Sequence, residues 1–311
     1  MRPTHVALVS VAVLALAALG ILVASRGPAA DAPLAAGDAT GHYRQQKAAA
    51  DAAAEALKGV LRIPRQAAPA PLNAPPQAGP ADAAGAAPAS AAQPPSAAEA
   101  APSPAVGPLF YTAEGVPAHG CTASVVHSPA GDLVVTAAHC VYMDGFRTDL
   151  AFVPGYQDGT APYGVWVPTS IDIDPEWAAD RDPDHDVAFL RVRPAKGGPP
   201  VERVTGAERL RFDPPRERPT QVLGYPNDEE RPVSCRNTTA GEGDTQLRFD
   251  CEGLPNGTSG SPFLTDVDQG TGLGTLVGVL GGKDEGGDEE TSYASYFGPA
   301  VKRLYERATR A

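Results

Sequence analysis

The sequence predicts an all-β domain over residues 106–311, and three observations support this. Short runs rich in Val, Leu, Phe and Thr alternate there with Gly, Pro, Asp and Asn, as is typical of a barrel or a sandwich. The region has about the length of one such domain. All four cysteines also lie in it. The predicted strands span 122–126, 132–137, 186–192, 219–224, 245–250, 261–264, 275–281 and 293–297.

The chain begins with a nearly uncharged apolar run over residues 6–24, between Arg2 and Arg26. The run is longer than the usual apolar core of a signal peptide, about 7 to 15 residues, and close to the roughly 20 residues that span a bilayer. Residues 1–26 are therefore predicted to be a signal peptide or an N-terminal membrane anchor. Both alternatives place the rest of the chain outside the cytoplasm, either secreted or tethered to the outer face of a bacterial membrane.

Residues 27–105 are predicted to be a linker or a pro-segment. The stretch 43–62 is rich in Ala, Gln, Glu and Lys, which favours a helix, either a solvated helix in a stalk or part of a removable pro-segment. Residues 64–105 repeat Pro and Ala and predict a disordered, semi-rigid stalk.

The last segment predicts an amphipathic helix that closes the domain. Pro299 precedes a stretch in which Val301, Leu304, Tyr305 and Ala308 follow helical spacing. Lys and Arg occupy the other face and the C-terminal end, where they suit the helix dipole.

The charge of the domain excludes one class of partner. The chain has a net charge of -12, and residues 106–311 hold 31 of its 37 acidic residues. Nucleic-acid binding is not expected, because it requires clustered Lys and Arg against phosphates. The expected partner is a protein or peptide substrate, and we expect a monomer without a cofactor or metal.

The four cysteines, Cys121, Cys140, Cys235 and Cys251, predict two disulfides in an exported chain. Three pairings are open from the sequence, and pairing neighbours along the chain would close two modest loops. Each disulfide would stabilise the fold by about 3 kcal/mol. The spacing does not match a zinc site, because neither C-x-x-C nor H-x-x-x-H occurs.

Three local patterns carry candidate catalytic residues. V-V-T-A-A-H-C ends a predicted strand with His139, D-H-D-V-A-F-L-R-V leads Asp186 into another, and G-T-S-G-S-P brackets Ser259 with glycines. A buried Asp is costly unless it is hydrogen-bonded, and orienting an imidazole provides such a bond. Glycines allow a tight turn whose N–H groups converge on one point, as an oxyanion hole requires.

Together, in the order His, Asp, Ser, these patterns resemble the chymotrypsin-like serine peptidases over about residues 106–311. The resemblance implies two six-stranded antiparallel β-barrels with the active site between them. It also implies that His139 is the general base, Asp186 its orienting partner and Ser259 the nucleophile. The N–H groups of Gly257 and Ser259 would form the oxyanion hole, and Cys121 would pair with Cys140.

The sequence departs from digestive members of that family. Thr258 replaces the Asp that receives a freed N-terminus, and no I-V-G-G-like start occurs, so activation through that ion pair is not expected. The motif G-T-S-G-S-P resembles the one found in the bacterial glutamyl-endopeptidase branch of the family. The G-x-S-x-G elbow of α/β-hydrolases is not matched, because Ser261 occupies its last position.

The resemblance places the primary substrate pocket at Gly253 and at Leu280, Gly281 and Gly282. Gly253 stands where trypsin-like members carry an Asp, and no His follows on the strand where glutamate-specific members carry one. An uncharged, small or apolar residue is therefore expected before the scissile bond. The acidic loop 284–290 is expected to favour basic residues at outer subsites.

The remaining features have simpler readings than a functional site. The acids from Asp172 to Asp186 could wrap a calcium ion, but they lack the glycine and terminal glutamate of an EF-hand, and a solvated loop is favoured. His119 and His127 are expected to face solvent. The alternative function is a non-catalytic, surface-displayed binding module on a peptidase scaffold.

Overall fold

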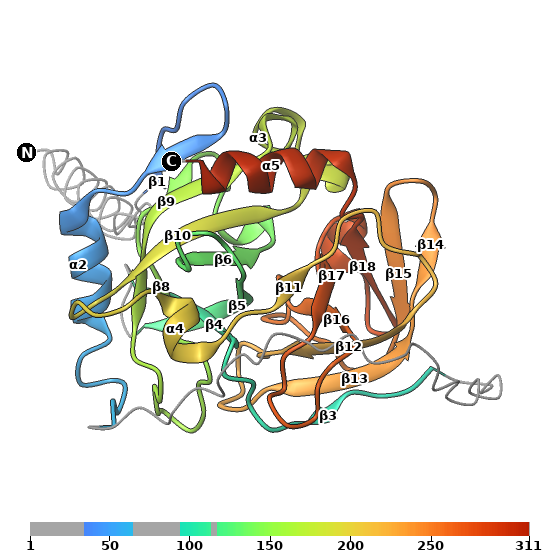
Figure 1. Cartoon of the computed structure of the whole chain (residues 1–311), viewed down its shortest axis with the longest axis horizontal. Coiled ribbons are helices and arrows are strands. Elements are labelled where there is room, and N and C mark those ends of the chain that lie inside the picture. The colour runs from blue at the N-terminus through green and yellow to red at the C-terminus, as the bar shows by residue number, and fades with distance from the viewer. Residues whose placement is uncertain (1–33, 65–93, 113–116, 311) are drawn as a thin grey trace, which may run out of the picture. The chain divides into compact units, whose positions relative to one another are not determined.

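A computed structural model describes residues 34–64, 94–112 and 117–310. The chain is mostly β-structure, and Figure 1 shows its strands in two groups with a helix at the C-terminal end. The predicted signal or anchor over residues 1–26 and most of the Ala/Pro-rich stretch lie outside the described residues. Within the described part of the chain, no helix is long and apolar enough to cross a membrane.

The first group of strands is a closed antiparallel barrel. Its order is β10-β6-β5-β4-β8-β9, and pairing of β10 with β9 closes it. Alternate side chains point inward and build a core that includes Val125, Val134 and Leu190, all fully buried. The strands are β4 (Val106–Tyr111), β5 (Ala118–Val126), β6 (Leu133–Thr136), β8 (Leu150–Phe152), β9 (Trp166–Ile173) and β10 (Ala188–Pro194).

The second group comprises two sheets. A six-stranded sheet has the order β11-β17-β16-β12-β13-β3, and a three-stranded sheet has the order β14-β15-β18. The strands are β3 (Ala98–Glu99), β11 (Arg209–Leu210), β12 (Pro219–Gly224), β13 (Val233–Thr238), β14 (Ala240–Glu242), β15 (Gln246–Asp250), β16 (Pro262–Thr265), β17 (Thr275–Val279) and β18 (Thr291–Ser295).

The all-β prediction is confirmed, but the described residues form only one continuous closed barrel. After β17 the chain enters the loop 281–287, and β18 then pairs with β15. Beyond β17, the bridge between Leu280 and Ala294 and the N–H of Gly281, which donates to the carbonyl oxygen of Tyr293 at 3.0 Å, link the chain to β18. The second group therefore comprises two sheets around a shared core that contains Phe249 and Phe263, and its closure into a second six-stranded barrel stays a prediction.

Residues 34–64 pack against the first barrel. β1 (Leu34–Ala35) pairs with β7 (Phe146–Arg147), and β2 (His42–Arg44) pairs with β9. The helix predicted over 43–62 spans only α2 (Lys47–Ala56), because β2 pairing takes its first residues and Gly59, with φ of +88°, follows its end. The helix buries Ala50, Ala53 and the adjoining Leu57 in a core shared with β8 and β9.

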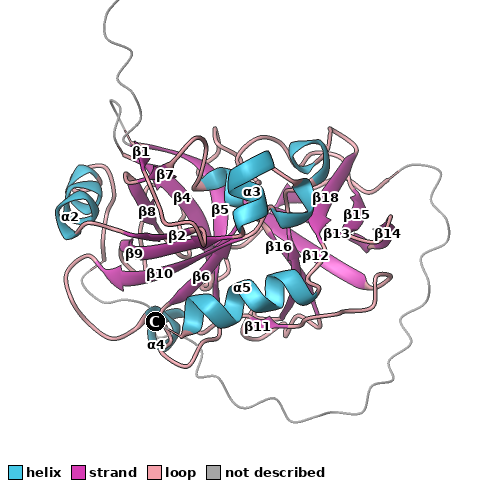
Figure 2. Ribbon diagram, turned by 90° about the horizontal axis from the view of Figure 1, so that it is seen from above, coloured by secondary structure: helices cyan, strands magenta, loops and turns pink. Residues whose placement is uncertain are grey.

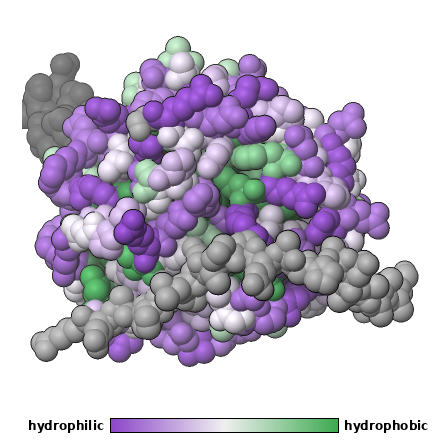
Figure 3. Space-filling view, viewed as in Figure 1, coloured by the Kyte–Doolittle hydropathy of each residue, from purple (hydrophilic) through white to green (hydrophobic). Residues whose placement is uncertain are grey.

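The C-terminal helix α5 (Pro299–Thr309) is confirmed, and it crosses both groups of strands (Figure 2). Its apolar face, with Val301, Leu304 and Ala308, joins a core cluster that contains Phe189 of the barrel and Leu276 of the second group. Most of the face seen in Figure 3 is hydrophilic, with apolar residues exposed in patches. Short helices are α3 (Pro175–Asp180), α4 (Val201–Thr205), η1 (Ala138–Cys140), η2 (Pro183–His185) and η3 (Lys283–Gly286).

Both disulfides join neighbouring cysteines along the chain, as the sequence favoured. Cys121 on β5 is bonded to Cys140 in η1, and Cys235 on β13 is bonded to Cys251 just after β15. Each disulfide therefore links two elements of the same half, and the second joins the two sheets of that half.

Candidate active site

His139, which is half-buried, and Asp186, which is buried, form a hydrogen-bonded pair in the first barrel. His139 lies in η1, just after β6, and Asp186 lies between η2 and β10 with no exposed surface. The imidazole Nδ1 lies 2.8 Å from Oδ2 of Asp186, and the backbone N–H of His139 donates to Oδ1 at 2.9 Å. The backbone N–H of Gly282 donates to Oδ2 at 2.8 Å. The buried carboxylate is thus hydrogen-bonded at both oxygens, and with Nδ1 as donor, Nε2 can accept a proton.

The surroundings make His139 more basic than an ordinary histidine. Burial alone would lower its pKa, but the negative charge and hydrogen bond of Asp186 raise it, and the charge of Glu285 adds to them, so the net pKa is raised. An imidazole that gains a proton here is stabilised by the adjacent carboxylate. This is the behaviour required of a general base.

Ser259 lies half-buried in a turn that only glycines on either side allow. Gly257 and Gly260 have φ of +100° and +80°. A Cβ atom on Gly257 would lie 2.2 Å from the backbone nitrogen of Asn227, and one on Gly260 would lie 2.2 Å from the carbonyl oxygen of Thr122. Both the left-handed backbone and the close packing therefore require glycine.

Two backbone N–H groups of this turn are available to a ligand. Those of Thr258, Gly260 and Ser261 donate to carbonyl oxygens at 2.6 to 3.1 Å. By contrast, the N–H groups of Gly257 and Ser259 donate to no acceptor among the described residues. These are the two donors predicted to form an oxyanion hole.

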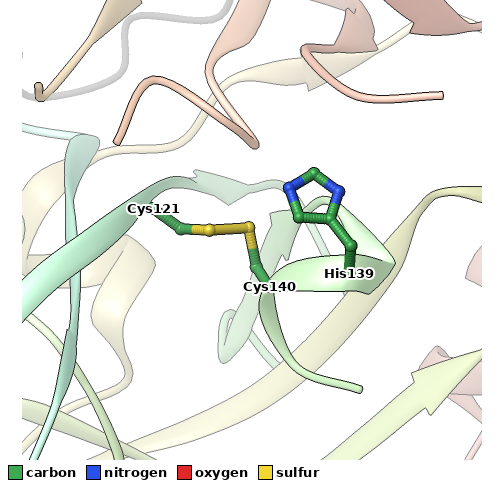
Figure 4. A group of neighbouring side chains, drawn as sticks. All are labelled: Cys121, His139 and Cys140. Atoms are coloured by element: carbon green, nitrogen blue, oxygen red, sulfur yellow. A yellow bond between two sulfur atoms is a disulfide. The ribbon is translucent and has the colours of Figure 1, made fainter. Parts of the chain in front are cut away.

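The turn is attached to the strand that adjoins His139. The N–H of Thr122 donates to the carbonyl oxygen of Ser259 at 2.7 Å, and the preceding Cys121 is bonded to Cys140 beside the imidazole (Figure 4). The described residues include no hydrogen bond from the Ser259 hydroxyl to His139. In serine peptidases without substrate, the corresponding hydrogen bond is often long.

A cavity of about 610 Å³ opens beside Ser259. Gly253 and Leu280 line it, as predicted for the substrate pocket, whereas Gly281 and Gly282 contact the Asp186 carboxylate instead. The predicted outer acidic loop lines this same cavity, with no Lys or Arg in its described lining. Its acidic lining residues are Glu252, Glu285, Asp288, Glu289 and Glu290.

Cys121, His139 and Cys140 form the one described group with metal-ligand geometry. The disulfide bond between the two sulfur atoms leaves no thiolate to bind a metal, so the group does not suit one. In the acidic stretch 172–186, Asp174 and Asp182 cap the N-termini of short helices, accepting from backbone N–H groups. Both acids therefore have a structural role at a helix start.

His119 does not face solvent, contrary to expectation. It is buried among Phe110, Tyr156 and Tyr225, whose rings it contacts edge-on, whereas His127 is exposed as expected. Burial lowers the pKa of His119. The sequence around His119 could not predict this, because the aromatic residues that cover it come from other parts of the chain.

Ser261 is also excluded as a nucleophile. Its side chain has no exposed surface, and its hydroxyl lies where a Cβ atom on Gly224 would be. Sequence reasoning missed Gly282 and Glu285 as groups that act on the His–Asp pair. Their contributions come from a loop 96 or more residues from Asp186 in the chain, so no local pattern could reveal them.

Comparisons with known proteins agree with this geometry. A model of the trypsin-like peptidase domain matches residues 121–279. The protease Anisep from Arthrobacter nicotinovorans superposes with a TM-score of 0.61 at 24% identity, covering 68% of this chain and 99% of its own. A thermostable serine protease, AL20, from an extremophilic microorganism gives 0.58 at 27%, covering 67% and 97%. A Glu endopeptidase gives 0.55 at 18%, covering 70% and 98%. No curated relative matches.

Proposed function

Since the chain belongs to the trypsin-like peptidase family, we propose that it is a serine endopeptidase that hydrolyses peptide bonds through an acyl-enzyme. One observation carries the proposal. A hydrogen-bonded Asp186–His139 pair, in which Asp186 is buried, lies next to a serine turn whose Gly257 and Ser259 N–H groups have no acceptor among the described residues.

In the proposed mechanism the Ser259 Oγ attacks the carbonyl carbon of the scissile bond while Nε2 of His139 takes the hydroxyl proton. The two N–H groups of the turn stabilise the resulting oxyanion. When this tetrahedral intermediate collapses, the C–N bond breaks and His139 passes its proton to the leaving amine. A water molecule, deprotonated by His139, then attacks the acyl-enzyme and releases Ser259. Asp186 keeps its charge and stabilises the imidazolium throughout.

A fluorophosphonate probe tests the proposal against the alternative of a non-catalytic binding module. We expect the full chain to be labelled at Ser259 and to cleave peptides, and Ser259→Ala to lose both properties while remaining folded. Ser261→Ala, a control that removes a buried hydroxyl two residues away, should still be labelled. Wild-type protein that is not labelled and does not cleave peptides, and so behaves like Ser259→Ala, would support the binding module instead.

The cavity lining leads to a prediction about specificity. Gly253 and Leu280 suit an uncharged side chain, and the five surrounding carboxylates repel a negative one. We therefore expect an acidic residue before the scissile bond to be disfavoured, and basic residues in the substrate to be favoured at low salt. A peptide-library digest at two salt concentrations checks this. Dominant cleavage after Glu would contradict it.

We also propose that the protein is exported and is secreted or tethered through residues 6–24. The two disulfides support this, because such bonds persist in oxidising compartments. Fractionation of cells, with mass spectrometry of the protein's N-terminus, tests both the location and the cleavage after residue 26. Recovery from the cytoplasm with free thiols would contradict the proposal.

A further inference from the structure

Thr122 on β5 makes an unusual set of contacts to the serine turn. Its side chain has no exposed surface. Its hydroxyl accepts the N–H of Tyr225 at 2.9 Å and donates to the carbonyl oxygen of Gly257 at 3.0 Å. Its backbone N–H donates to the carbonyl oxygen of Ser259 at 2.7 Å. Its own carbonyl oxygen accepts the Thr136 hydroxyl at 2.7 Å. All its polar groups are thus hydrogen-bonded.

These contacts act on Gly257 and Ser259, whose N–H groups find no acceptor in the part of the chain that the structure describes. Peptide groups are planar, so holding the carbonyls of Gly257 and Ser259 restrains the backbone torsions between them. Those torsions set the direction of the Ser259 N–H. Restraint is needed most at Gly257, since glycine has more backbone freedom than any other residue and here adopts φ of +100°.

The hydroxyl is the part of Thr122 that joins separate pieces of the molecule. It links β5 of the barrel to two parts of the second group. These are Tyr225, which follows β12, and Gly257 in the serine turn. A valine would occupy nearly the same space but would leave the Tyr225 N–H and the Gly257 carbonyl without this partner. The buried hydroxyl therefore has a role that packing alone would not require.

We infer that Thr122 is a positioning residue that sets the geometry of the oxyanion-binding turn through its hydroxyl. The inference rests on the proposed peptidase function. Thr122 acts through Gly257 and Ser259. Among the described residues no hydrogen bond joins Thr122 to His139 or Asp186, so its loss should change how well the oxyanion is bound without changing the basicity of His139.

The test compares Thr122→Val, which removes the hydroxyl at nearly constant shape, with Thr122→Ser, which keeps it. Thr205→Val is the matched control, because Thr205 is equally buried and its hydroxyl donates to the backbone oxygens of Val201 and Gly206, not to the serine turn. In the full chain we expect Thr122→Val to lower kcat about 10- to 100-fold, since lost oxyanion contacts act on the transition state. KM and the acid limb of the pH–rate profile should stay unchanged.

The inhibition constant of a peptide aldehyde is a second measurement, and a general loss of stability would not change it. Addition of Ser259 to the aldehyde carbon creates a tetrahedral oxyanion, so its inhibition constant should rise by the factor by which kcat/KM falls. Thr122→Ser should restore both values, and Thr205→Val should leave both at the wild-type level. If Thr122→Val does not fold, Thr122→Ala is compared with Thr122→Ser in the same way.

The outcomes separate this inference from the proposed function. Wild-type protein that neither cleaves peptides nor reacts with a fluorophosphonate would remove the proposed function itself. Active wild-type protein with a fully active Thr122→Val variant would overturn the role of Thr122 alone. So would a variant whose kcat falls while its affinity for the aldehyde is unchanged, or one that serine does not rescue.

Discussion

At the scale of single residues, the charge near His139 sets the pH range of the proposed activity. Burial lowers the pKa of His139, but Asp186 and then Glu285 raise it to a net value above that of an ordinary histidine. A general base must be unprotonated, so kcat/KM should rise with pH through a midpoint above about 6.5.

Glu285→Gln should move that midpoint to lower pH, because it removes one negative charge that favours the protonated imidazole. Glu289→Gln is the matched control, since Glu289 lines the same cavity but is not among the charges that act on His139. The pH–rate profiles are measured at low salt, where screening is weakest. Equal midpoints in wild type and Glu285→Gln would contradict the assignment.

Glu208 is a second residue whose pKa is shifted by burial, and the shift should have a measurable effect on stability. It has no exposed surface, its Oε2 accepts the N–H of Gly274, and its Oε1 has no partner among the described residues. Burial raises its pKa to about 8, against smaller opposing effects of Gly274 and Arg209. The folded protein therefore holds this proton at pH values where the unfolded chain has released it.

The sign of the pH effect follows from that difference. The stability contributed by protonated Glu208 is fully present below a pH of about 4.5 and is lost as the pH rises to about 8. Glu208→Gln should thus flatten the fall in unfolding free energy across this range, by a few kcal/mol at the alkaline end. Urea unfolding at several pH values measures this, with the exposed Glu217→Gln as control. Parallel curves for wild type and Glu208→Gln would refute it.

At the scale of elements, the segment that carries α2 should behave as part of the peptidase domain. Leu57 follows α2, is 1% exposed, and packs in a core with Ala151 and Val167 of the barrel. Leu57→Ala should destabilise the protein by about 2 to 4 kcal/mol. Val60→Ala, at a site that is 43% exposed, should change stability by less than about 0.5 kcal/mol.

This prediction distinguishes an integral segment from a stalk or a removable pro-segment. Denaturant unfolding gives the free energies, and mass spectrometry gives the N-terminus of the active protein. We expect active protein to retain residues 34–64, since α2 covers apolar barrel residues that would otherwise meet water. Active protein that begins after residue 64, with a silent Leu57→Ala variant, would show that the segment is dispensable.

At the scale of the whole molecule, the core beneath α5 should make the two groups of strands unfold together. Phe189 of the barrel, Leu276 of the second group and Leu304 of α5 share one buried cluster. Both tryptophans, Trp166 and Trp177, belong to the barrel half. Tryptophan fluorescence therefore reports that half, and far-UV circular dichroism reports the entire fold.

We expect the two signals to give coincident unfolding transitions, the test of cooperative behaviour. Leu304→Ala should lower both midpoints because it leaves a cavity where the halves meet. Lys302→Ala, on the exposed face of the same helix, should leave them unchanged. Separate transitions in wild-type protein would mean that the halves are independent despite their shared core.

Short-range patterns in the sequence were enough to predict the all-β class, the helix that begins at Pro299 and the pairing of Cys121 with Cys140. Each depends on neighbours in the chain, on local periodicity or on a short motif. The same patterns nominated His139, Asp186 and Ser259 as the catalytic groups, which remains a proposal.

Only the tertiary structure decided where residues 34–64 lie and that Gly282 donates to Asp186. It also decided that the acidic loop lines the cavity beside Ser259 and that Thr122 is hydrogen-bonded to the serine turn. Each of these facts joins segments that are far apart in the sequence. The physical reason is that hydrogen bonds and burial depend on which surfaces meet after folding. A Thr, a Gly or an alanine-rich helix has the same sequence whether it contacts solvent or the serine turn.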